Sequence, residues 1–276
     1  MPRRTPIILC CLLLAACASD RVPLSYQLES GRRLEHRLTL RAEITRSLQG
    51  QTREQRVVAT FLAAQEVTTP LPEGGADATF SLTPESLMVD GRPVDPGPEQ
   101  EFVVQLGPDG RVVAIAEAGG QPGEALGPVG LERLLPRLRP VLPGAPVRPG
   151  DSWRSDTRFV DETGRFSLEA RSRLLQLGIV EGHRAALVRT TYESPVDRQE
   201  VFANAVADLQ GTDVGAQRAW FALDGFLIEA TGDSVGSYKV AFTPPGGEAE
   251  LTPVAATLVV RLHSELRLLS DETATG

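Results

Sequence analysis

Cysteine is absent from almost the whole chain. Cys10, Cys11 and Cys17 are the only three cysteines among the 276 residues. The chain beyond Cys17 therefore has no disulfide of its own and no cysteine-based metal site. Its stability must come from buried apolar surface, and about 260 residues are enough for one large domain or two small ones.

Positive charge, aromatic residues and long apolar runs are scarce too. The chain carries 28 basic against 36 acidic residues, a net charge of −8, which argues against nucleic-acid binding. No later stretch approaches eighteen consecutive apolar residues, so no membrane-spanning helix is expected. The three histidines, His36, His183 and His263, form no metal-ligand motif. We therefore predict neither a metal nor another cofactor.

The N-terminus has the pattern of a secretory signal peptide. Arg3 and Arg4 precede an apolar stretch at 7–16, and Leu14-Ala15-Ala16-Cys17 follows the order of a cleavage site. These four residues resemble the lipobox of bacterial lipoproteins. The resemblance implies removal of 1–16 and attachment of a diacylglycerol to Cys17, which would anchor a mature chain of net charge −10. The alternative is an ordinary signal peptide that happens to contain a cysteine.

The same resemblance implies a location in the cell envelope. In Gram-negative cells an Asp after the lipidated cysteine retains lipoproteins in the inner membrane, whereas here Ala18 and Ser19 follow Cys17. Sorting to the outer membrane is the expectation for such a cell. In a Gram-positive cell the protein would lie on the outer face of the cytoplasmic membrane.

A period of two residues dominates the rest of the chain. From 34 to 48 the even positions are mostly apolar and the odd positions mostly charged, which predicts a long strand with one buried and one hydrated face. Residues 256–268 alternate in the same way. Further strands are predicted at 56–68, 76–83, 101–107, 111–117, 152–160, 165–177, 184–193, 217–223, 226–232 and 236–242. Asp109-Gly110, Asp224-Gly225 and Glu181-Gly182 have the composition of hairpin turns between these strands.

Helix is predicted at one place only. Leu131, Leu134, Leu135 and Leu138 have helical spacing, interrupted by Pro136, so we expect a short helix near 127–135. The composition of the Pro-rich passage 139–150 predicts a linker or a strap across the sheet. We expect the segment 127–143 to cover the apolar face, with its four leucines turned inward.

The predicted organisation is a lipid tether at 17–24, a single β-rich domain at 25–270 and a C-terminal tail at 271–276. Two loosely similar passages, 26–33 and 159–166, suggest half-repeats at 25–120 and 150–240, joined through 125–150. The alternative is two unrelated meanders that share turn residues.

One motif suggests catalysis but lacks the required context. Gly232-Asp233-Ser234-Val235-Gly236 matches G-x-S-x-G, which places a nucleophile only on a strand–turn–helix. The residues after it are extended and then broken by Pro244 and Pro245, so we interpret the motif as a Gly-rich hairpin. No other catalytic constellation is present, and we expect a protein that is not an enzyme.

The predicted fold is mainly β, α+β at most: a long-stranded antiparallel sheet, curved into a half-barrel or barrel-like form, with one short helix. It is similar in architecture to bacterial carriers of the LolA, LolB and LppX/LprG kind, which implies an acyl-chain groove on the concave face. This sequence has less helix than those folds. The hypothesis is a lipid or acyl-chain ligand, and the alternative is an interaction protein with a solid core and an envelope protein as partner. Expected groove residues are Leu38, Leu40, Ile44, Leu131, Leu134, Leu135, Leu138, Leu258, Val260 and Leu262.

Overall fold

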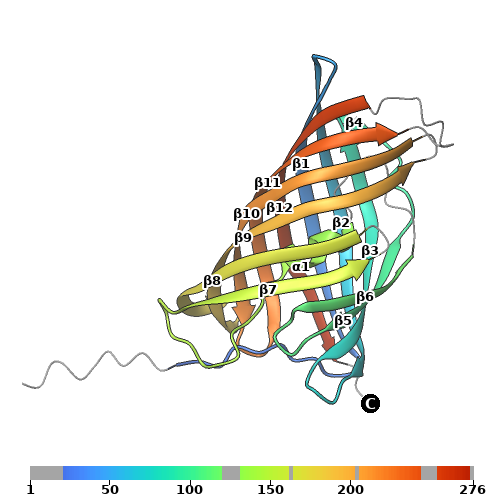
Figure 1. Ribbon diagram of the computed structural model, residues 1–276. Coiled ribbons are helices and arrows are strands. Elements are labelled where there is room, and N and C mark those ends of the chain that lie inside the picture. Colours follow the sequence, from blue (N-terminus) through green and yellow to red (C-terminus); the bar gives the residue numbers. More distant parts are fainter. Residues whose placement is uncertain (1–20, 120–130, 162–163, 203–204, 244–253, 274–276) are drawn as a thin grey trace, which may run out of the picture.

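The computed structural model describes residues 21–119, 131–161, 164–202, 205–243 and 254–273. These residues form one antiparallel sheet of twelve strands, curled into a nearly closed barrel that encloses a single short helix (Figure 1). The mainly β, barrel-like prediction is therefore confirmed. The signal peptide 1–16, the lipobox with Cys17, and the last three residues, 274–276, lie outside the described residues.

Two meanders make up the sheet, one from each half of the chain. The first contains β1 (Arg32–Leu48), β2 (Gln51–Pro70), β3 (Ala76–Val89), the short β4 (Arg92–Pro93), β5 (Gln100–Leu106) and β6 (Val112–Gly119). The second contains β7 (Ser152–Asp161), β8 (Gly164–Val180), β9 (His183–Phe202), β10 (Ala205–Ala222), β11 (Phe226–Thr243) and β12 (Val254–Thr273). The strand order is β6-β5-β3-β2-β1-β12-β11-β10-β9-β8-β7, with β4 beside β3. Pairing of β1 with β12 joins the meanders, and the edge strands β6 and β7 approach each other across the remaining gap.

The hairpins follow the turn chemistry of the sequence. Asp109-Gly110 connects β5 to β6, Asp224-Gly225 connects β10 to β11, and Glu181-Gly182 connects β8 to β9, as predicted. Glu181 and Gly182 both have positive φ values, 50° and 88°. Two consecutive residues of positive φ are the geometry that matches the twist of two-residue hairpins.

Apolar side chains fill the barrel and charged ones cover it. Along β1 the even positions from 34 to 44 are buried and the odd ones are exposed or half-buried, and β12 alternates in the same sense. Ion pairs run across the convex face, including Arg37–Glu85 at 3.2 Å and Arg41–Glu265 at 2.7 Å. The period-two prediction and the choice of the buried face are confirmed for 34–44 and for 256–268, whereas at the end of β1 the even residues Arg46 and Leu48 are exposed.

The helix α1 (Leu131–Leu138) lies inside the barrel, as Figure 1 shows. It extends past Pro136 to Leu138, so the predicted end at 135 was too early; residues 127–130 lie outside the described residues. A helix of eight residues is too short to be stable in water alone. Its place in the apolar interior of the barrel is what stabilises it.

Two predicted boundaries were wrong, because chain assigned to the termini belongs to the fold. Val22 forms a β-bridge with Val147, and Leu24 is buried, so the folded domain includes residues expected to be tether. At the other end β12 runs to Thr273, and Asp271 accepts two hydrogen bonds from Arg32. Burial of apolar side chains and this ion pair fix both segments.

One end of the barrel is closed by chain from outside the sheet. Val22, Leu24, Leu142 and Val147 form a second apolar cluster together with buried side chains of β8, β9 and β10. The N-terminal segment and the Pro-rich segment 139–150 therefore pack on each other at this end, which is the lower end in Figure 1. The Pro-rich passage is thus a strap packed against the barrel.

Candidate ligand-binding site

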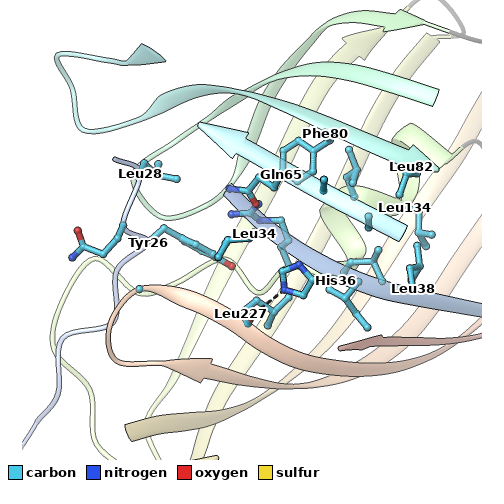
Figure 2. Close-up of a pocket in the computed structure, with 18 residues that line it drawn as sticks. Tyr26, Leu28, Leu34, His36, Leu38, Gln65, Phe80, Leu82, Leu134 and Leu227 are labelled. Carbon is cyan, nitrogen blue, oxygen red and sulfur yellow. Dashed lines mark hydrogen bonds between the residues drawn. The ribbon is translucent and has the colours of Figure 1, made fainter. Parts of the chain in front are cut away.

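An apolar cavity lies between α1 and the inner face of β1, β2 and β3, near the closed end of the barrel. Figure 2 shows side chains from these strands and from the N-terminal segment converging on it. Leu38, Leu134 and Leu138 form part of its wall, whereas Tyr26 and Leu28 line it from the N-terminal segment. The free volume is about 50 Å³. That is room for a few water molecules, far below the roughly 300–1,000 Å³ of typical ligand pockets.

Strand alternation and helical spacing together produce the aliphatic wall. Leu38 is fully buried because even positions of β1 point inward. Leu134 and Leu138 are four residues apart, so they share one face of α1, and both are buried against the core. The wall is therefore specified by two periodic patterns that are visible in the sequence.

A buried arginine supplies positive charge to this cavity. Arg139, directly after α1, is 9% exposed and lines the cavity. Its guanidinium donates to the side-chain oxygen of Gln65 and lies 4.5 Å from the ring centre of Tyr26 and 5.5 Å from that of Phe80. Its Nε is buried without a hydrogen-bond partner, and no carboxylate of the described residues forms an ion pair with it.

Tyr26 links the N-terminal segment to the strap. Its hydroxyl donates to the carbonyl of Pro140 at 2.9 Å, and its ring meets Phe221 edge to face with centres 4.9 Å apart. Gly110 lets the ring approach, because a β-carbon there would collide with it. Burial raises the pKa of Tyr26, although nearby Arg139 opposes the shift, so the hydroxyl stays protonated at neutral pH.

His36 lies inside the barrel and is neutral. Its Nε2 lies 2.8 Å from the carbonyl oxygen of Leu227, which can only accept, so Nε2 carries the proton. Burial lowers the pKa of His36 to about 4; the charge of Arg139 adds to this shift and the hydrogen bond to Leu227 opposes it. The cavity therefore contains one fixed positive charge, on Arg139, and no charge on its histidine.

The low pKa of His36 predicts that acid weakens the fold. Between pH 6.5 and about 4 the unfolded chain binds a proton at this residue and the folded chain does not. This contribution to stability is therefore complete above pH 6.5 and is lost as the pH falls toward 4. We expect a loss of about 3 kcal/mol in the free energy of unfolding, measured by urea titration.

The matched variant for this measurement is His36→Gln, whose amide can still donate to Leu227. It should lose less stability than the unmodified protein over the same pH range. His183→Gln changes a half-exposed histidine and serves as the control. Identical pH profiles for His36→Gln and the unmodified protein would show that His36 is not buried as described.

Further polar contacts hold the end of α1 against the opposite wall. Arg137 forms a buried ion pair with Asp213 of β10, and Tyr238 of β11 donates to the same carboxylate. Gln217 donates to the carbonyl of Leu138 at 2.6 Å. On the other side Arg139 contacts Gln65 of β2. The residues that end α1 are thus fixed to both halves of the sheet.

The G-x-S-x-G residues have a structural role that differs from the predicted hairpin. They lie within β11, which runs unbroken from 226 to 243. Gly236 faces inward, and a β-carbon there would collide with the Tyr238 hydroxyl and the Asp213 carboxylate. The glycine therefore makes room for the polar contacts that hold α1.

The predicted groove residues divide into two groups. Leu38, Leu134, Leu135 and Leu138 line the cavity, and the side chain of Leu131 lies outside the described residues. The others pack in the same core without lining the cavity: Leu40, Ile44, Leu258, Val260 and Leu262. The polar members Tyr26, Gln65 and Arg139 were missed, and only the inward register of Gln65 could have pointed to one of them.

Comparison with known proteins identifies no family. No family model matches the chain, and no curated protein matches its sequence. Among solved structures, the crystal structure of Pseudomonas aeruginosa OccK2 (OpdF) is similar over 87% of this chain and 100% of its own, with 8% identity and a TM-score of 0.22. Similarity at this level establishes neither a shared fold nor a shared function. Within the described residues no helix is long and apolar enough to cross a membrane, and no cluster of metal-ligating side chains is present.

Proposed function

We propose that this protein is a non-enzymatic, lipid-anchored lipoprotein of the cell envelope that binds a hydrophobic ligand, an acyl chain, inside its curved sheet. The observation that carries the proposal is the aliphatic cavity between α1 and β1–β3. Its walls suit hydrocarbon, because burial of apolar ligand surface is worth about 25 cal/mol per Å². The helix α1 is the only helix among the described residues, and it packs against this apolar wall.

The proposed anchor would hold the cavity close to a membrane. Val22 is fixed to the barrel by its bridge to Val147, and it is the fifth residue after Cys17. Five extended residues span at most about 18 Å. A lipid on Cys17 would therefore keep the closed end of the barrel, where Tyr26 and Leu28 line the cavity, near the bilayer surface. The charged convex face of the sheet is suited to water, which supports attachment through the lipid.

Binding of an acyl chain requires the cavity to widen. Its present free volume is about 50 Å³, and Leu134, Leu135 and Leu138 of α1 form one of its walls. Movement of these side chains away from β1–β3 would open space lined by leucine, alanine and phenylalanine. Ligand hydrocarbon would then occupy the place of the leucine side chains. Contacts between the ligand and β1–β3 would replace much of the apolar contact that these leucines lose.

The small cavity also favours a second candidate. A barrel filled by its own side chains, with α1 fixed on both sides, suits an interaction lipoprotein that binds another envelope protein through its outer surface. This second candidate needs no ligand and no movement of α1. A measurement of ligand binding by the purified protein distinguishes the interaction lipoprotein from the ligand-binding one.

The test is saturable binding of the neutral apolar probe N-phenyl-1-naphthylamine to the delipidated mature chain with Cys17→Ser. Ala63 lines the cavity from β2, so Ala63→Leu should fill it and weaken probe binding at least about tenfold. Thr60→Leu on the opposite face of β2 is the matched control and should leave binding unchanged. If the unmodified cavity shows no saturable signal, the ligand-binding proposal is replaced by the interaction-protein candidate.

The anchor has its own test. In the full-length precursor, Cys17→Ser should prevent lipidation, because no diacylglycerol can be attached, and should either release a soluble protein into the aqueous fraction or block processing. Fractionation and intact mass measure both changes. A Cys17→Ser protein that is processed normally and stays membrane-bound would contradict the lipobox interpretation.

A further inference from the structure

We infer that the ligand has an anionic head group, a carboxylate on a single acyl chain, and that Arg139 binds it. This inference rests on the proposed function and names the class of ligand. It is carried by a buried positive charge that forms no ion pair with any carboxylate of the described residues and lies at an aliphatic cavity.

The first step is the charge of Arg139. A guanidinium stays protonated at every pH a protein experiences, so burial cannot neutralise it. Burying a charge without a partner is costly, and buried arginines are usually paired with carboxylates. Arg139 contacts the neutral amide of Gln65 and the faces of two aromatic rings, and none of these carries a negative charge.

Two other buried arginines of this protein each have a carboxylate partner. Arg137, two residues earlier, is comparably buried and is paired with Asp213. Arg32 is paired with Asp271 at 2.7 Å. Arg137 also has a buried Nε without a hydrogen bond, so what sets Arg139 apart is that no carboxylate among the described residues pairs with it. A ligand carboxylate would supply it.

The second step is the geometry around the guanidinium. Gln65 occupies one terminal nitrogen, and Nε has no partner. A carboxylate can accept two parallel hydrogen bonds from an arginine, with a geometry that a fatty alcohol cannot reproduce. The aromatic rings of Tyr26 and Phe80 hold the guanidinium plane in place, and the leucine wall begins beside it. The charge and the wall together fit an amphiphile with one charged end.

The test compares two ligands of equal chain length, palmitate and hexadecanol, by displacement of the neutral probe at pH 8. We expect palmitate to bind at least about tenfold more tightly than hexadecanol, since hydrogen bonds to charged groups are the strong ones. Arg139→Gln should remove this preference while hexadecanol binds within about twofold of its original affinity. Arg139→Lys should restore part of the preference. Arg148→Gln, which changes an exposed arginine of the same strap, should alter neither affinity.

Each outcome separates this inference from the proposed function. Equal affinity of the unmodified protein for palmitate and hexadecanol overturns the inference and leaves hydrophobic binding intact. A preference for palmitate that survives Arg139→Gln also overturns it, because the charge would then be recognised elsewhere. Failure of both ligands to displace the probe, or absence of probe binding, overturns the proposed function as well. The comparison on the unmodified protein needs no variant, so it holds even if Arg139→Gln does not fold.

Discussion

Replacing Asp213 by alanine is expected to lower the free energy of unfolding by about 3 to 5 kcal/mol, which is the usual cost of breaking a buried ion pair from one side. The substitution leaves the guanidinium of Arg137, whose side chain is 8% exposed, without a counter-charge. It also removes the acceptor of the buried Tyr238 hydroxyl. Urea unfolding followed by circular dichroism measures the change.

An exposed ion pair provides the control for this prediction. Arg37 and Glu85 lie 3.2 Å apart with side chains 53% and 39% exposed, so Glu85→Ala should cost about 1 kcal/mol or less. The double variant Arg137→Met with Asp213→Leu should recover part of the loss, because an apolar pair can replace a buried ionic one while the Tyr238 hydroxyl still lacks its acceptor. If Asp213→Ala costs no more than Glu85→Ala, then Arg137 is hydrated and α1 is not fixed to β10.

The alternation of 34–48 and 256–268 was enough to predict the two strands at which the meanders meet. An apolar face on every second residue can be buried only by an extended chain, and β1 and β12 pair along their whole length. Strand ends were less predictable. Residues 194–216, which were not predicted as strand, belong almost entirely to β9 and β10.

Local composition explains why that region was missed. Pro195, Gly211 and Gly215 normally weaken strands. In the folded protein Gly215 is required by packing, since a β-carbon there would lie 2.5 Å from the hydroxyl of Tyr192. Gly211 is required by the neighbouring backbone of Ser237. These reasons depend on neighbours far away in the chain, so the sequence pattern cannot reveal them.

The candidate site, too, was predictable from the sequence in one part and not in the other. Its aliphatic part was predicted, because strand and helix periods place Leu38, Leu134 and Leu138 on inward faces. Its polar part was not, because Arg139 meets Tyr26 and Gln65 only after the strap has folded back against the barrel. No local pattern distinguishes this arginine from Arg148, the exposed arginine of the same Pro-rich passage.

The largest contrast between neighbouring positions is expected along β1. Leu38 is 0% exposed and points into the core, so Leu38→Asp buries a carboxylate without a partner and also removes leucine packing, a loss of about 5 kcal/mol or more. Arg37→Asp changes the adjacent residue on the convex face, where the side chain is 53% exposed and one surface ion pair is lost. We expect a cost of about 1 kcal/mol there.

The pair Val260→Asp and Arg261→Asp repeats the comparison on β12, and urea unfolding measures all four variants. Similar costs at both positions of either pair would mean that the inward face of that strand is wrongly assigned, and with it the aliphatic wall on which ligand binding depends.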